Sequence, residues 1–155
     1  MLDLYDELSA LVSALHGDCV QYALCGGLAL AVHGVTRATV DIDILIPEEW
    51  LAAASSVARG LGYTIEAAPM RFAGGAVEIR RMSKADPDSG EMLMLDFRLV
   101  TQGLAHIWET REEVAWERGS LWVVSRAGLV ELKKLRGSGQ DRDDITRLTA
   151  GDDEA

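Results

Sequence analysis

Two aspartates separated by one residue, Asp41 and Asp43, stand in an otherwise apolar stretch. Residues i and i+2 of a β-strand point to the same face, about 6–7 Å apart. Two carboxylates placed in this way repel each other unless a cation lies between them, and Mg²⁺ is usually held by one or two carboxylates together with substrate phosphates. A solvated outer face is the alternative, but aspartate is a poor strand former and the apolar neighbours indicate a well-covered strand. The pair therefore favours a magnesium site.

A glycine pair, Gly26 and Gly27, lies between a short apolar run and a helical pattern. Glycine lets the backbone approach a ligand closely, and the free N–H groups at the start of the following helix attract anions. These properties suit a phosphate. Taken alone, the pair is explained more simply by a tight turn between a strand and a helix.

A third acid, Asp96, is the single acidic residue of the apolar segment 92–97. A buried carboxylate without a partner is costly, so Asp96 needs one. If its strand neighbours the strand of Asp41, three carboxylates converge and could hold two Mg²⁺ ions for in-line phosphoryl transfer. A salt bridge to Arg98 or to another arginine is the alternative, and the sequence leaves both open.

Hydrophobic periodicity predicts the elements that position these residues. Helices are expected over 2–16, 28–33, 47–59, 101–110, 126–136 and 142–149. Strands are expected over 19–25, 39–46, 63–67, 76–82 and 91–99, followed by a hairpin of 112–117 with 120–124. Residues 84–90 are predicted to form a loop, Ser125 and Asp141 to cap helices, and Asp144 to interact favourably with its helix dipole. This alternation predicts an α/β (α+β) fold with a single mixed β-sheet flanked by helices.

The length of 155 residues predicts one domain over 1–150, with an acidic, disordered tail at 151–155. The 15 basic and 25 acidic residues give a net charge of −10, which argues against general DNA binding. No apolar run is long enough to span a membrane, and the acidic N-terminus does not resemble a signal peptide. We therefore expect a cytoplasmic protein, with Cys19 and Cys25 as buried free thiols.

The combined pattern resembles a known superfamily. A hydrophobic residue before Gly26-Gly27, thirteen intervening residues, Asp41-x-Asp43 and a later strand aspartate are together similar to the DNA polymerase β-like nucleotidyltransferases. The fuller string from Tyr22 to Asp43 and the closing segment 129–145 resemble the AbiEii-type branch, which occurs in toxin–antitoxin and abortive-infection systems. The resemblance covers roughly residues 20–150.

The resemblance implies a Mg²⁺-dependent nucleotidyltransferase that moves NMP from an NTP to an acceptor hydroxyl on a protein, a tRNA or a small molecule. It implies two Mg²⁺ ions with the bound NTP, and a cognate toxin or antitoxin as a partner. The implied catalytic and metal-binding residues are Asp41, Asp43 and Asp96, and the implied nucleotide-binding residues are Gly26, Gly27, Arg37, Thr39 and Lys133. A non-catalytic nucleotide- or partner-binding module of the same fold is the alternative.

Other residues bear on the acceptor. A strip with Arg71, Arg80, Arg81 and Lys84 could meet an acceptor RNA, although a solvated strand face is the commoner explanation. An acidic pocket beyond the metal site would instead favour a cationic antibiotic. His33 is expected to be a capping or core residue, and the four tryptophans are expected to pack in the core or on the surface.

Overall fold

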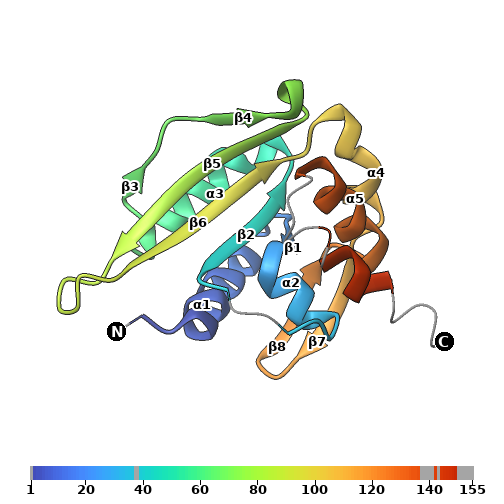
Figure 1. The fold of residues 1–155 in the computed structure, drawn as a ribbon. Coiled ribbons are helices and arrows are strands. Elements are labelled where there is room, and N and C mark those ends of the chain that lie inside the picture. Colours follow the sequence, from blue (N-terminus) through green and yellow to red (C-terminus); the bar gives the residue numbers. More distant parts are fainter. Residues whose placement is uncertain (1, 37–38, 137–141, 143, 150–155) are drawn as a thin grey trace.

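The computed structural model describes residues 2–36, 39–136, 142 and 144–149. Its eight strands form one mixed sheet in the order β3-β5-β6-β2-β1-β8-β7, with β4 paired to the outer side of β5. The strands are β1 (Ala23–Cys25), β2 (Asp41–Ile46), β3 (Ile65–Glu66), β4 (Met70–Phe72), β5 (Val77–Ala85), β6 (Met92–Leu99), β7 (Glu112–Trp116) and β8 (Gly119–Val123). Figure 1 shows β5 and β6 as the two longest strands, with β2 beside β6.

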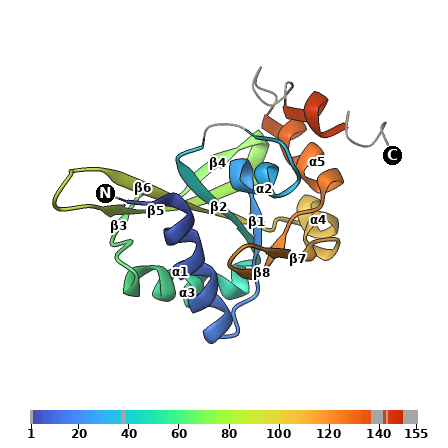
Figure 2. The ribbon, with the colours of Figure 1, turned by 90° about the horizontal axis from the view of Figure 1, so that it is seen from below.

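Helices cover both faces of this sheet. Figure 2 shows α1 (Leu4–Gly17) and α3 (Glu48–Gly60) on one face, and α2 (Gly26–Val32) and α5 (Arg126–Arg136) on the other. The remaining helical elements are the 3₁₀ turns Ala73–Gly75 and Gln102–Leu104, α4 (Ala105–Glu109) and a segment at 144–149. The predicted fold class, an α/β fold with a single mixed sheet flanked by helices, is confirmed.

Helix α1 is amphipathic and closes one side of the core. Its N-cap Asp3 accepts a hydrogen bond from the backbone N–H of Asp6 at 2.9 Å, which satisfies a donor that the first turn leaves unpaired. Leu8, Leu11 and Leu15 recur at helical spacing and are almost completely buried. These leucines fix α1 against the sheet.

Strand β2 is central, as its apolar pattern predicts. It pairs with β1 in antiparallel and with β6 in parallel orientation. Ile42 and Ile44 are fully buried, while Asp41 and Asp43, which alternate with them, point to the opposite face and are only partly covered. The sheet therefore has an apolar face under α1 and α3 and a face that carries carboxylates.

Several predicted bounds are wrong in detail. Strand β1 keeps only the last three residues of the predicted 19–25, because the backbone turns at Cys19, whose φ is 56°. Cys19 is also exposed rather than buried. Lys84, placed in a loop by the sequence, belongs to β5, which continues to Ala85 in antiparallel pairing with β6. The short strand β4 was not predicted at all.

Other elements agree closely with the prediction. The hairpin of β7 and β8 is present, and α5 covers the predicted range. The Ser125 hydroxyl accepts a hydrogen bond from the N–H of Gly128 at 3.1 Å, as a helix cap does. Asp141 lies outside the described residues. None of the helices that the structure describes is long and apolar enough to cross a membrane.

Candidate active site

Three carboxylates meet on one face of the sheet, as the parallel pairing of β2 and β6 requires. The register places Asp43 directly opposite Asp96, with Asp41 two residues earlier on β2. All three side chains therefore point to the same face, away from α1 and α3. The condition that the sequence left open, that the strand of Asp96 neighbours that of Asp41, is met.

Asp96 also has a cationic partner. Arg81 stands opposite it on β5 and donates from Nε to Oδ1 at 2.8 Å and from a terminal nitrogen to Oδ2 at 2.9 Å. The partner is thus Arg81 and not the nearby Arg98. Two parallel hydrogen bonds between a guanidinium and a carboxylate fix both groups in orientation as well as in position. Asp96 is held in place on the floor of the site.

Asp41 and Asp43 have no such partner among the residues that the structure describes. Oδ1 of Asp41 is buried and accepts no hydrogen bond within the described part of the chain. Burial, reinforced by the neighbouring Asp96, raises the pKa of Asp41. Burial likewise raises the pKa of Asp43 to about 6, although the positive charge of Arg98 opposes the shift. Both carboxylates are therefore poorly compensated without a bound cation.

The two glycines leave room for these side chains. Gly26 has φ +70°, and a Cβ built on it would lie 2.1 Å from Oδ2 of Asp43. A Cβ on Gly27 would lie 2.7 Å from Oγ1 of Thr39. The backbone at the start of α2 thus approaches β2 as closely as only glycine allows. This close packing explains the pair through the fold alone, and it also places the turn directly beside Asp43.

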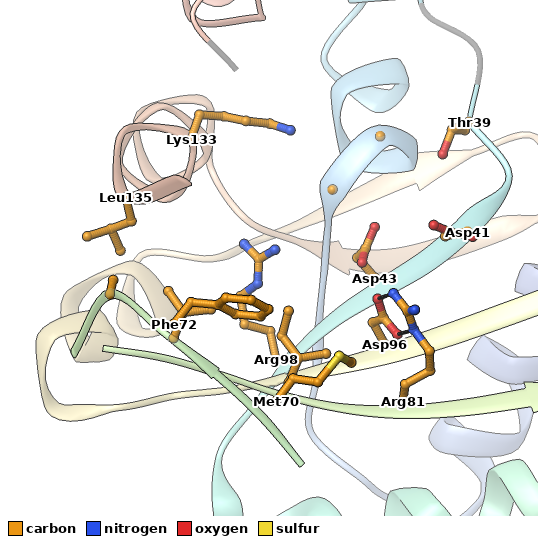
Figure 3. Close-up of a pocket in the computed structure, with 15 residues that line it drawn as sticks. Thr39, Asp41, Asp43, Met70, Phe72, Arg81, Asp96, Arg98, Lys133 and Leu135 are labelled. Carbon is orange, nitrogen blue, oxygen red and sulfur yellow. Dashed lines mark hydrogen bonds and ion pairs between the residues drawn. The ribbon is translucent and has the colours of Figure 1, made fainter. Parts of the chain in front are cut away.

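These groups line one cavity of about 630 Å³. Figure 3 shows the carboxylates of Asp41, Asp43 and Asp96 along one side of it and Lys133 and Leu135 of α5 on the other. The β4–β5 edge adds an apolar wall of Met70, Phe72, Ala73, Val77 and Ile79. The cavity has the size of a small-molecule site. It combines an apolar wall with three acidic and three basic side chains.

Lys133 and Asp144 join the end of the chain to this cavity. Nζ of Lys133 lies 3.4 Å from Oδ2 of Asp144, and both residues are buried. The Asp144 side chain is turned inward and completely buried, and the favourable interaction with its helix dipole stays a prediction. Lys133 lines the cavity, and the nucleotide-binding role that the resemblance implies for it stays a prediction.

The oxygen donors of the site fit one Mg²⁺ ion. An orphaned buried oxygen on Asp41 and the partly buried carboxylate of Asp43 are hard oxygen ligands on one face, as this ion requires. Among the described residues, no three acidic, histidine or cysteine side chains are grouped so that they could hold a metal together. The residues fit one ion held by Asp41 and Asp43 and completed by ligand oxygens, with Asp96 engaged by Arg81.

The other residues that the sequence singled out differ in their position relative to the cavity. Thr39 lines the cavity, whereas Arg37 lies outside the described residues. His33 is the C-cap residue of α2, and its Nε2 lies 2.9 Å from the carbonyl oxygen of Val124, which agrees with a capping role. Sequence reasoning considered Arg98 only as a partner for Asp96. The signal that could have identified it is a second charged residue in the apolar strand, two positions after Asp96 and so on the same face.

The basic strip carries its own counter-charges. Arg71 and Arg80 pair with Glu78 at 2.6 and 3.1 Å, and Lys84 pairs with Glu7 at 3.0 Å. Arg81 is held by Asp96. The four cations are thus paired with three carboxylates, because Arg71 and Arg80 share Glu78, so about one positive charge of the strip stays uncompensated toward a polyanion.

Comparisons with known proteins identify the fold. No protein-family model and no curated protein matches the chain. The structure is similar to that of the lincosamide antibiotic adenylyltransferase LnuA bound to lincomycin, with a TM-score of 0.62 and 16% identity over 93% of this chain and 95% of LnuA. It is also similar to ANT(2'')-Ia in complex with adenylyl-2''-tobramycin, with a TM-score of 0.64 and 13% identity over 94% of this chain and 87% of that chain. The chain thus has the fold of these nucleotidyltransferases.

Proposed function

We propose that this protein is a Mg²⁺-dependent nucleotidyltransferase that transfers NMP from an NTP to a hydroxyl group of a small molecule. The observation that carries the proposal is the register that sets Asp43 opposite Asp96, with Asp41 beside them, on the floor of a cavity of small-molecule size. A fold shared with LnuA and ANT(2'')-Ia supports it. The AbiEii-type branch and a toxin–antitoxin partner stay predictions from the motif.

Asp41 and Asp43 would hold the metal, with Gly26, Gly27 and Lys133 on the side of the triphosphate. Mg²⁺ at this position would neutralise the negative charge of the phosphate oxygens during transfer. Asp96, fixed by Arg81, takes the proton of the acceptor hydroxyl. The acceptor oxygen then bonds to the α-phosphorus, the bond from that phosphorus to the bridging oxygen breaks, and pyrophosphate leaves. Such transfer relies on positioning and charge neutralisation.

Two observations favour a small-molecule acceptor over RNA. The four cations of the strip along 71–84 are paired with three carboxylates of the chain, so only about one net positive charge is left to attract a polynucleotide. The cavity is also bounded by an apolar wall on which Phe72 and Leu135 remain 53% and 40% exposed. Exposed apolar side chains inside a cavity are typical of a small-molecule site. An acceptor with an apolar part and a free hydroxyl fits this wall.

Thermal unfolding tests the donor half of the proposal. Mg²⁺ with the correct NTP at about one hundred times its Kd should add about 2.7 kcal/mol, which is on the order of 5–10 °C for a domain of this size. The double variant Asp41→Ala/Asp43→Ala should lose this shift. If no NTP raises the Tm of the wild-type protein in the presence of Mg²⁺, the proposal fails.

A transfer assay tests the acceptor half. An NTP labelled on its α-phosphate is incubated with lincomycin, with tobramycin or with bulk tRNA, because the first two represent an amphipathic and a polycationic small molecule. Label is expected on a small molecule and should disappear with Asp96→Asn. Label on tRNA alone would move the acceptor class to RNA.

A further inference from the structure

Arg98 is a buried cation that forms no ion pair among the described residues, although its charge acts on Asp43. Only 7% of the residue is exposed, and its Nε is completely buried without a hydrogen-bond partner. Within the described residues, its guanidinium makes no hydrogen bond and no ion pair. Burying a charge without a partner costs several kcal/mol, so such a group calls for an explanation.

The side chain points into the cavity. Arg98 lies two residues after Asp96 on β6 and is therefore on the same face as the three carboxylates. Figure 3 shows its guanidinium group directed into the cavity rather than toward Asp96, which is held by Arg81 instead. The two arginines of the cavity thus differ, because Arg81 is paired with Asp96 and Arg98 has no partner among the described residues.

A second cation faces the same space. The charges of Arg98 and Lys133 both act on Asp43 and on the thiol of Cys25, the residue just before Gly26. Arg98 comes from β6 and Lys133 from α5, so two separate elements bring positive charge to the end of β1 where the glycine turn begins. A positive site next to that turn and to Asp43 suits an anion that spans them.

We propose that Arg98, with Lys133 as the second cation, binds a phosphate or pyrophosphate oxyanion, and that its source is the β,γ-diphosphate of the NTP donor. A guanidinium presents a planar fork of donors that matches two phosphate oxygens, and it stays charged when buried. The anion site stands on the geometry of Arg98. Its assignment to the donor rests on the proposed function. A phosphorylated acceptor would present the same chemistry.

The anion site is tested without metal and without turnover. Binding of inorganic pyrophosphate in EDTA is measured by calorimetry for the wild-type protein and for Arg98→Met, Arg98→Lys and Arg80→Met. Hydrogen bonds to charged groups contribute about 1.5–3 kcal/mol, so Arg98→Met should raise the Kd roughly 10- to 100-fold. Arg98→Lys keeps the positive charge but loses the planar set of donors, so its Kd should lie between those of the wild type and of Arg98→Met. Circular dichroism checks that each variant is folded.

Arg80 is the matched control. It lies on the neighbouring strand with a buried, unpartnered Nε, but it is paired with Glu78 and lines a different cavity, together with residues of α3. Arg80→Met should leave the Kd for pyrophosphate unchanged. The proposal is overturned if the wild-type protein does not bind pyrophosphate, or if folded Arg98→Met binds it with the wild-type Kd. It is also overturned if Arg80→Met weakens pyrophosphate binding as much as Arg98→Met does. Should Arg98→Met not fold, Arg98→Lys with an unchanged Kd overturns it as well.

Nucleotides distinguish the two sources. If Arg98 holds the terminal phosphates of the donor, Arg98→Met should weaken α,β-methylene-ATP with Mg²⁺ at least tenfold and leave AMP unaffected. A loss of pyrophosphate binding with unchanged affinity for α,β-methylene-ATP would overturn the donor assignment and favour an anionic acceptor. If no NTP binds the wild type while pyrophosphate binds through Arg98, the anion site stands and the proposed nucleotidyltransferase function fails.

Discussion

Glu7, Lys84 and Tyr63 meet on the face of the sheet that α1 and α3 cover, whereas Asp41, Asp43 and Arg98 lie in the cavity on the other face. On the covered face, both Glu7 oxygens accept from Nζ of Lys84 at 3.0 and 3.1 Å, and one also accepts from the hydroxyl of Tyr63 at 3.0 Å. In the cavity, Asp41 Oδ1 and Arg98 Nε have no partner in the described part of the chain.

The two regions solve the same physical problem in opposite ways. A buried charge is costly, and a structural group recovers that cost through partners within the chain. Glu7, which is paired with Lys84 and Tyr63, is such a structural group. In the cavity, Asp41, Asp43 and Arg98 form no ion pair among the described residues, which lowers the stability of the empty protein and keeps these groups available. Unsatisfied charges at a cavity are therefore a better guide to function here than charge itself.

The largest effect is expected where the glycine turn packs against Asp43. Gly26→Ala should lower the free energy of unfolding by on the order of 3 kcal/mol, because φ is +70° and the new Cβ would fall 2.1 Å from Asp43 Oδ2. Urea denaturation measures the loss. Gly34→Ala is the control, since Gly34 has φ +85° with open space around its Cβ position and should lose only about 1 kcal/mol. If both variants lost the same free energy of unfolding, the close contact of Gly26 with Asp43 would add no cost beyond that of the positive φ.

The features of the cavity that local sequence determines could be predicted, and those that depend on contacts between distant segments could not. The alternation in 39–46 and the glycine pair were enough to predict β2, the turn and the shared face of Asp41 and Asp43, because these are local consequences of strand and glycine geometry. The adjacency of β6 to β2 was stated only as a condition for the three carboxylates to converge, and the structure meets it.

The remaining features depend on register between distant segments. Which arginine binds Asp96 is decided by the pairing of β5 with β6, which sets Arg81 opposite it and Arg98 opposite Ile79. Strand β4 has three residues, too few for a periodic signal. Asp144 was expected only to interact with its helix dipole, whereas its contact with Lys133 depends on tertiary packing. Local sequence could not reveal these contacts.

The next effect has the opposite sign and depends on pH. The pKa of Asp43 rises from 3.8 to about 6 in the folded protein, mainly through burial. The folded state therefore holds this proton more tightly than the unfolded chain, and stability is lost as the pH rises from about 4 to about 6. The penalty above that range is ~2–3 kcal/mol. Asp43→Asn should remove most of it and make the metal-free protein more stable at pH 8.

Guanidinium denaturation in EDTA at pH 8 and at pH 4 measures this difference. At pH 4, both the wild-type carboxyl and the amide are neutral in the folded state, so the two proteins should be nearly equally stable. A variant that is less stable than the wild type at pH 8 would assign Asp43 a structural role and remove the contrast between the two faces.

The smallest effect is expected on the covered face, where the charges are paired. Glu7→Gln keeps an acceptor for Tyr63 but removes the ion pair with Lys84, whose side chain is 26% exposed and can regain part of its hydration. The expected loss is about 1 kcal/mol, in denaturation experiments at neutral pH. Because an ion pair is involved, the difference from the wild type should shrink in high salt. Glu7→Gln would then destabilise the protein, whereas Asp43→Asn would stabilise it. The reason for the opposite signs is that the Glu7 carboxylate is paired with Lys84, whereas Asp43 has no ion-pair partner among the described residues. A stabilising Glu7→Gln would show that pairing does not separate the two regions.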